Sequence, residues 1–285
     1  MLREIFMKIK HSKFALFLVK LGIRRLTVAR RIYGFMMKTN TNKPINIDEY
    51  KIFIDDKDSM GLLQRPDFYS NNSEVDIMKE FVKEGDVVID LGANIGVYTL
   101  LLAKLVGKAG KVYSFEPDSE NFKILVKNII INGYKNITPI NKAVSNKTGR
   151  IKLYLSEWNK GDHRIYSSDE KRKFKEIRAV SLDDYFLGNK EEIKFVKMDI
   201  QGAEAIAFDG GKSFFNKKQP IVLQEFWPVG IESSGKDYKE FLEFINSKFK
   251  IYSEHNIKKE INPEEILSIV SVKRRNHMNL LCIPK

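Results

Sequence analysis

Cysteine is nearly absent from this 285-residue chain, because Cys282 is the only one. A single thiol excludes an internal disulfide framework and is typical of a reducing compartment. The four histidines, His11, His163, His255 and His277, are scattered, and neither an H-E-x-x-H motif nor a paired-cysteine spacing occurs. The sequence therefore predicts no metal site. His11, His255 and His277 have no companions in the sequence, and we assign them no role.

Membrane-spanning apolar runs are missing as well. The stretch from Phe14 to Leu21 is interrupted by Lys20 and is too short to span a bilayer. It also lacks a small-residue cleavage site, which argues against a signal peptide. Residues 1–43 hold eleven Lys and Arg against one acid, so most of the net charge of +12 lies there. The nearly neutral remainder argues against an enzyme that binds nucleic acid across its active face.

Residues 1–44 are predicted to form a basic helical N-terminal arm ahead of a catalytic domain over residues 45–285. Lys13, Lys20 and Arg24 share one face of the expected helix. Two interpretations stay open. The arm packs on the body with its charges in water, or it lies on an anionic membrane surface as a peripheral contact. Both suit a cytoplasmic protein, in the second case at the inner face of the membrane.

Residues 87–99 read as a buried strand, a glycine turn and the start of a helix. The pattern is D-x-G-x-x-x-G, with Asp90, Gly92 and Gly96, whereas a dinucleotide site reads G-x-G-x-x-G and would have glycine where Asn94 stands. Gly92 has no Cβ, so we expect a ligand to approach the backbone there. An acid before the first glycine suits a cationic ligand, which favours S-adenosylmethionine over NAD. The alternative is that Asp90 only caps the turn.

Glu116 follows the next predicted strand, residues 111–115, and precedes Pro117. A carboxylate at the tip of the second strand accepts hydrogen bonds from both ribose hydroxyls of a nucleotide. Taken alone, Glu116 reads equally well as a surface acid. Together with Asp90 and the strand–turn–helix context, it predicts cofactor binding.

From residue 87 onward, predicted strands and helices alternate. The strands are 87–90, 112–115, 137–141, 193–200 and 220–226, and the main helices are 97–105, 120–131, 204–208 and 238–248. An insertion interrupts the alternation, with extended pieces at 150–155 and 176–181 around a polar loop. Residues 250–254 and 278–283 are expected to form a terminal antiparallel hairpin. The alternation predicts one α/β domain with helices on both faces of the sheet.

Further candidates stand at later strand ends, where such sheets bind ligands. Asp199 could act as general base or hold the cofactor ammonium, and Glu204 could assist; both could equally cap the turn and the helix that follows. In the insertion, His163 could act as a base and Arg164 could clamp an anion, or the loop is simply solvated. Glu225 precedes Phe226 and Trp227, which suits a sugar or a buried aromatic pair.

These motifs resemble the FkbM family of S-adenosylmethionine-dependent methyltransferases. The resemblance rests on residues 88–99, 115–117, 141–145 with Gly149, 180–184 and 197–204, which agree in order and spacing over roughly residues 50–225. The last stretch, K-x-D-x-x-G-x-E, is the most family-specific. Gln201 departs from the pattern, because the family usually has Glu there, and this weakens any role that needs a charge at that position.

The resemblance implies a Rossmann-like, seven-stranded methyltransferase sheet and O-methylation of a hydroxyl, which we expect on a sugar of a glycan or glycolipid. The expected cofactor residues are Asp90, Gly92, Asn94, Gly96, Tyr98, Glu116, Lys142, Ala143 and Asp199. The expected catalytic residues are Asp199 (the first choice for the base), His163 and Glu204, and Arg164 and Glu225 are expected to bind the substrate. Two other functions stay open: an RNA methyltransferase, which lacks the expected N-P-P-Y-type stretch, and a cofactor-binding scaffold without catalysis.

Overall fold

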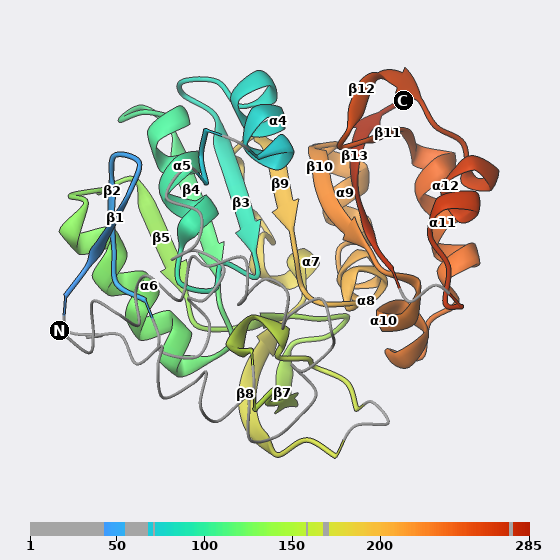
Figure 1. Cartoon of the computed structure of the whole chain (residues 1–285), viewed down its shortest axis with the longest axis horizontal. Coiled ribbons are helices and arrows are strands. Elements are labelled where there is room, and N and C mark those ends of the chain that lie inside the picture. The colour runs from blue at the N-terminus through green and yellow to red at the C-terminus, as the bar shows by residue number, and fades with distance from the viewer. Residues whose placement is uncertain (1–42, 55–67, 71, 158, 168–170, 274–275) are drawn as a thin grey trace, which may run out of the picture. The chain divides into compact units, whose positions relative to one another are not determined.

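A mostly parallel sheet organises the part of the chain that the structure describes. The computed structural model describes residues 43–54, 68–70, 72–157, 159–167, 171–273 and 276–285. In these residues the main sheet has eight strands (Figure 1), in the order β12 (Asn256–Glu260), β11 (Phe249–Ser253), β13 (Met278–Pro284), β10 (Ile221–Phe226), β9 (Ile193–Met198), β3 (Val87–Leu91), β4 (Lys111–Phe115) and β5 (Ile137–Ile140). Strands β10, β9, β3, β4 and β5 are parallel. Strand β13 lies antiparallel between β10 and β11.

The predicted α/β class is confirmed, with two corrections of detail. The sheet has one strand more than the seven expected, because β12 pairs with β11 at the edge. Its sequence, NIKKE, is mostly exposed and carries no apolar alternation that would have marked it as a strand. Strands β11 and β13 are antiparallel neighbours, as predicted, but β12 and α12 (Pro263–Ile269) lie between them in the chain. The two strands therefore do not form a hairpin.

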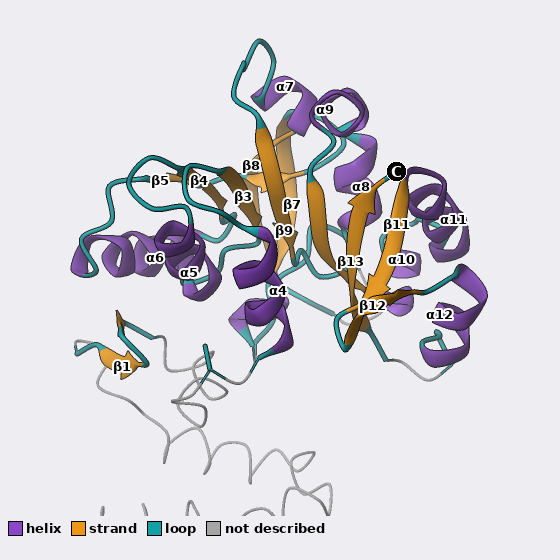
Figure 2. Cartoon of the chain, turned by 90° about the horizontal axis from the view of Figure 1, so that it is seen from above, coloured by secondary structure: helices purple, strands orange, loops and turns teal. Residues whose placement is uncertain are grey.

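Helices cover both faces of the sheet (Figure 2). The helices of one face are α4 (Ser73–Phe81), α5 (Val97–Leu105) and α6 (Ser119–Ile131). Those that pack on the other face are α7 (Leu182–Tyr185), α8 (Glu204–Asp209), α9 (Lys212–Lys218), α10 (Pro228–Ser233), α11 (Tyr238–Lys248) and α12. Helices α7, α9, α10 and α12 escaped the sequence analysis because seven residues or fewer show no clear helical period.

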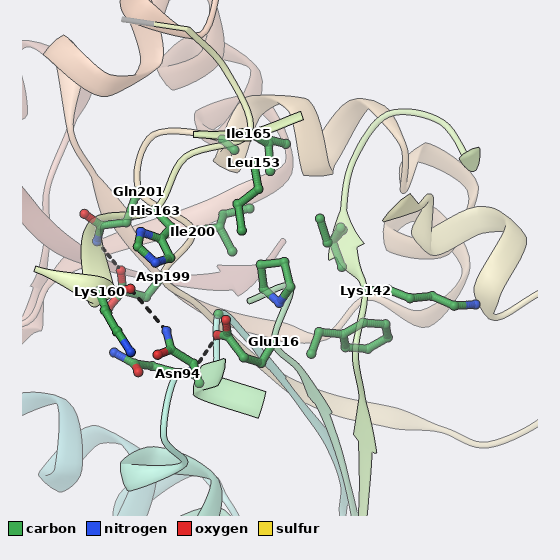
Figure 3. A pocket seen from close by; sticks show the side chains of 18 residues that line it. Asn94, Glu116, Lys142, Leu153, Lys160, His163, Ile165, Asp199, Ile200 and Gln201 are labelled. Atoms are coloured by element: carbon green, nitrogen blue, oxygen red, sulfur yellow. Dashed lines mark hydrogen bonds between the residues drawn. The ribbon is translucent and has the colours of Figure 1, made fainter. Parts of the chain in front are cut away.

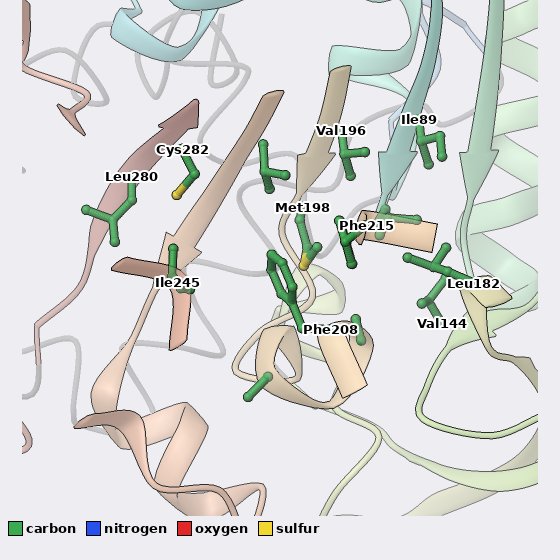
Figure 4. Packing of buried hydrophobic residues seen from close by; sticks show 14 of the residues in the cluster. Ile89, Val144, Leu182, Val196, Met198, Phe208, Phe215, Ile245, Leu280 and Cys282 are labelled. Carbon is green, nitrogen blue, oxygen red and sulfur yellow. The ribbon is translucent and has the colours of Figure 1, made fainter. Parts of the chain in front are cut away.

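Neighbouring residues of the central strands face opposite cores. Val88 packs with α4, α5 and α6, whereas Ile89 packs with the helices of the other face. In the second core the rings of Phe208 and Phe215 stack with centroids 4.1 Å apart (Figure 4). Each such buried side chain contributes about 1.5–3 kcal/mol relative to exposure. This double burial explains why the strands read as continuous apolar runs.

The insertion forms a small sheet of its own at the carboxyl ends of the main strands (Figure 1). Strand β7 (Gly149–Tyr154) pairs antiparallel with β8 (Phe174–Val180), and β8 pairs parallel with β6 (Ala143–Val144). The loop between β7 and β8 includes a short 3-10 turn, η3 (Lys160–Asp162). The two extended pieces predicted for the insertion are thus β7 and β8, and their pairing directs this loop towards the sheet edge.

Side-chain caps fix where two of the helices begin. The Asn72 side chain caps α4 by accepting from Glu74 N at 2.9 Å. Asp118 caps α6 in the same way. Ahead of α4, β1 (Ile45–Ile47) and β2 (Tyr50–Ile52) pair as an antiparallel hairpin.

The prediction for the N-terminal arm falls on residues 1–42, outside the described part of the chain. Within the described part, no helix combines the length and the apolar character needed to cross a bilayer.

Candidate active site

The turn after β3 is shaped by two glycines with left-handed backbone. Gly92 has φ of 84° and Gly96 has φ of 94°. A Cβ on Gly92 would lie 2.0 Å from the Asp199 carbonyl oxygen. The missing Cβ therefore lets the turn after β3 touch the turn after β9, and the approach of a ligand to the Gly92 backbone, which lines the cavity described below, stays a prediction. Asn94, between the glycines, is itself left-handed with φ of 50°, which an Asn side chain tolerates.

Glu116 joins the turn after β3 to the turn after β4. Its Oε2 accepts from Asn94 N at 2.8 Å (Figure 3). Its Oε1 accepts from Asp118 N at 2.8 Å. The carboxylate is buried, and backbone N–H groups are its partners in these two bonds. Buried carboxylates need such donors, so Glu116 also determines the shape of both turns.

A cavity opens at this point, below the insertion's loop (Figure 3). The side chains of Phe115, Val144 and Ile200 give it apolar walls, and Glu116 and Asp199 give it carboxylates. From the insertion, Leu153, Lys160, Gly161, His163 and Ile165 close it. The cavity thus combines apolar walls, which suit a flat ring, with acids that suit hydroxyls and a positive charge.

A buried lysine supports the turn after β9. The Lys197 ammonium lies 3.2 Å from Asp199 Oδ2 and 3.7 Å from Glu74 Oε1, and 4.5 Å from the centre of the Tyr98 ring. Burial alone would lower the pKa of Lys197, but the Asp199 and Glu74 carboxylates raise it above its ordinary value. Lys197 therefore stays charged inside the protein. The sequence signal for it is weak, because β9 contains a second lysine, Lys194, which is exposed.

Each carboxylate oxygen of Asp199 contacts another side chain. Oδ2 faces Lys197, and Oδ1 accepts from Gln201 Nε2 at 2.8 Å. Burial opposes ionisation of Asp199, yet Lys197 and Gln201 hold its pKa below the usual range. Gln201 adopts a left-handed φ of 56°. Its amide can donate to Asp199, which a carboxylate at this position could not.

Two further acids stand behind the cavity wall. Asp90 is buried, accepts from Thr99 Oγ1 at 2.6 Å, and has its pKa raised to about 6, chiefly by burial. Glu204 is fully buried, accepts from Ile200 N at 3.1 Å, and has its pKa raised to about 8 by burial. Neither residue lines the cavity. Because its pKa is about 8, Glu204 holds a proton at neutral pH.

Beyond Asp199, the end of β10 carries Glu225 and Trp227. The Arg164 guanidinium stacks over the Trp227 ring at 4.8 Å and is paired with Asp162 at 2.8 Å. Burial, with repulsion from Asp199 and Glu204, raises the pKa of Glu225 well above its ordinary value. The predicted Arg164, in the insertion's loop, and Glu225, near the end of β10, thus lie outside the cavity itself.

The insertion is fastened to the core beside the cavity. His163 Nδ1 accepts from Ser156 N at 3.0 Å, and its Nε2 faces Asp118 Oδ2 at 3.8 Å. Lys175 also bonds Asp118. Burial lowers the pKa of His163 despite the attraction of Asp118. On the other side, Tyr166 donates from its hydroxyl to the Gln201 carbonyl oxygen at 2.6 Å.

The structure brings about half of the predicted site residues to the cavity. Those that line it are Gly92, Asn94, Glu116, Lys142, Ala143, His163 and Asp199. Lys142 turns its side chain away (Figure 3), with Nζ 5.8 Å from the centre of the Tyr185 ring, so its backbone faces the cavity. Those that do not line it are Asp90, Gly96, Tyr98, Arg164, Glu204 and Glu225. The sequence analysis missed Leu153, Lys160 and Ile165, because nothing local marks a loop residue as facing a distant sheet.

Comparison with known proteins decides the family. A family model described as the methyltransferase FkbM domain matches residues 90–256. The chain belongs to the FkbM methyltransferase family. It is an S-adenosylmethionine-dependent methyltransferase, and the predicted cofactor is confirmed.

Individual relatives of this FkbM methyltransferase are distant. A FkbM methyltransferase of Methylobacillus flagellatus is 17% identical, with a TM-score of 0.43 over 90% of this chain and 59% of that one. Aeropyrum pernix fibrillarin, solved with natively bound S-adenosyl-L-methionine, is 15% identical, with a TM-score of 0.41 over 71% of this chain and 68% of that one. The uncharacterized protein MJ1452 of Methanocaldococcus jannaschii is 40% identical over 60 residues, which are 21% of this chain and 22% of that protein.

The cavity fits S-adenosylmethionine on the evidence of its own side chains. Asn94 Oδ1 is buried and has no hydrogen-bond partner among the described residues. This oxygen, beside Glu116, is therefore available to accept a hydrogen bond from a ligand. The carboxylate of Glu116 suits ribose hydroxyls, and that of Asp199 suits a cationic centre. Ala143 and Val144, with Ile165 from the insertion, offer an apolar slot for a base. These residues would hold the cofactor.

Proposed function

We propose that this enzyme transfers a methyl group to a hydroxyl oxygen of a sugar in a glycan or glycolipid. The observation that supports this most directly is the rim beyond Asp199, where Glu225 lies beside Trp227 and Arg164. Carboxyl groups bind sugar hydroxyls, and an aromatic face packs against the apolar face of a sugar ring.

When bound, S-adenosylmethionine supplies a sulfonium-activated methyl group that passes to the acceptor oxygen while the sulfur keeps the electrons of the broken bond. The protein's own task is then alignment and proton removal. Glu116 and the Ala143 backbone would hold the nucleoside end, and Asp199 would hold the cationic end. Ile165 and His163, which line the cavity from the insertion, would shield the bound cofactor from water.

The test is a methyl-transfer assay with the full chain and S-adenosylmethionine labelled on the methyl group. Cell-envelope glycans, glycolipids, total RNA and protein are offered as separate fractions. We expect alkali-stable label in a glycan or glycolipid fraction, because a methyl ether resists the mild alkali that removes methyl esters. Label confined to RNA would replace the proposal with an RNA methyltransferase. Cofactor binding without transfer to any fraction would favour a scaffold.

A further inference from the structure

None of the predicted bases is free to take a proton from the acceptor. Asp199 is paired on both oxygens, with Lys197 and with Gln201. His163 already accepts a hydrogen bond at Nδ1 and directs Nε2 at Asp118, and its side chain is only 8% exposed. Glu204 is fully buried and lies outside the cavity. The proton acceptor for the reaction therefore has to come from elsewhere.

His277, to which the sequence assigned no role, lies beside the carboxyl end of β10. Strand β13 runs antiparallel to β10, with Phe226 opposite Met278. The residue before β13, His277, therefore lies where β10 ends. Its Nε2 is 3.7 Å from Glu225 Oε1, and its side chain is 60% exposed, while that of Glu225 is 13% exposed. The ring is thus open to an incoming acceptor and has a buried carboxyl group behind it.

The acid beside His277 belongs to a larger group of charged side chains. Glu225 interacts electrostatically with Asp199, Glu204 and Glu74, and with Lys197. The His277 imidazole is close enough to act on Asp199, whose pKa it helps to lower. His277 thus lies within electrostatic reach of both Asp199 and Glu225.

We propose that His277 is the base that removes the acceptor hydroxyl's proton and that Glu225 positions its ring. The inference rests on the proposed O-methylation. As the hydroxyl oxygen bonds to the methyl carbon, its O–H bond breaks and the proton passes to the imidazole, which later returns it to water. The acceptor leaves as a methyl ether. Asp199 is then left to orient the cofactor and the acceptor between the cavity and His277.

His255 offers a matched control, because it too lies beside a glutamate. Its Nε2 is 3.9 Å from Glu254 Oε1 and its side chain is 79% exposed. With the fraction that the wild-type enzyme methylates, we expect H277Q to lower kcat by about 10²- to 10⁴-fold, the usual range for losing a general base. The KM for that fraction and the Kd for S-adenosylmethionine should change little. H255Q should keep wild-type kinetics.

Chemical rescue separates proton transfer from a structural role. Added imidazole should restore at least a tenth of wild-type kcat to H277A and should leave H255A unaffected, since a small base can enter the vacated space. E225Q should lower kcat less than H277Q does, because the base remains. A kcat within twofold of wild type in H277Q would overturn the inference, as would H277A that loses activity without any rescue. Failure of the proposed function looks different, because the wild-type enzyme itself would then label no hydroxyl acceptor.

Discussion

The cofactor half and the acceptor half of this site are built in contrasting ways. The cofactor half, at the ends of β3, β4 and β5, draws its key groups from one stretch, residues 92–144. The acceptor half, at the ends of β9, β10 and β13, draws on Arg164, Asp199, Glu225 and His277, which lie far apart in the chain. A short contiguous motif can be recognised in a sequence, whereas a site assembled from four segments cannot.

The two halves also treat their acids differently. Glu116 is satisfied by backbone N–H groups, whereas Glu204 and Glu225 each keep one buried oxygen without a hydrogen-bond partner among the described residues. In the cofactor half Glu116 therefore accepts from backbone donors, whereas in the acceptor half burial raises the pKa values of Glu204 and Glu225. Substitutions in the first should weaken cofactor binding, and those in the second should change rate and pH dependence.

The largest effect is expected where the halves touch, at Gly92. In Gly92→Ala the new Cβ would lie 2.0 Å from the Asp199 carbonyl oxygen at a left-handed backbone position. We expect a loss of about 5 kcal/mol in unfolding free energy, with cofactor binding lost as well. Gly133→Ala is the control, because Gly133 has φ of 73° but nothing within 4 Å of an added Cβ. It should cost about 1 kcal/mol. Equal losses of unfolding free energy in the two variants, measured by urea unfolding, would contradict the close approach of Gly92 to the Asp199 carbonyl oxygen.

The second-largest effect is expected when the buried cation of the acceptor half, Lys197, is removed. Lys197→Met leaves Asp199 and Glu74 without their buried partner, at a cost of about 4 kcal/mol at pH 7. Because Lys197 depresses the folded-state pKa of Asp199, this stability is present above the unfolded value near 4 and is lost as pH falls. The loss of unfolding free energy in Lys197→Met should therefore become smaller as pH falls from about 5 to about 3. Lys194→Met, at an exposed lysine, should show neither effect in urea unfolding.

Glu204 should make the fold less stable in alkali. Its pKa rises from 4.5 to about 8 on folding, so the folded state binds the extra proton. This contribution is complete below the unfolded pKa, declines as pH rises above it, and is lost by pH 8. Glu204→Gln should remove about 3 kcal/mol of pH dependence between about pH 5 and pH 8, measured by urea unfolding. The same change at exposed Glu192 should leave the pH profile as in wild type.

The smallest of these effects should separate the halves most cleanly. In Glu116→Gln one carboxylate oxygen becomes an N–H group that faces a backbone donor, Asn94 N or Asp118 N. We expect a loss of about 2 kcal/mol in cofactor binding, or roughly 30-fold in Kd by calorimetry. At saturating cofactor, kcat should stay close to wild type. Glu120→Gln, at an exposed residue of α6, should bind normally; if it weakens binding equally, the effect is one of net charge.

Much of the fold could be predicted from the sequence because the signals for its strands and long helices are local. The runs at residues 87–91 and 193–198 are apolar since both faces are buried, and they became β3 and β9. The short helices and β12 were missed, because tertiary packing rather than periodicity holds them. At the site, the sequence marked Gly92 for the approach of a ligand, which stays a prediction. Only the structure shows that the Asp199 carbonyl oxygen takes up the space of its missing Cβ.

By itself the sequence determined the α/β class, the family and the cofactor, because strand–turn–helix units and their ligand turns are written in consecutive residues. The tertiary structure alone decided which distant residues share an edge. The antiparallel direction of β13 delivers His277 to Glu225, and the pairing of β7 with β8 carries Ile165 over the cavity. Such placements follow from how strands pair across the whole sheet, and no local pattern encodes them.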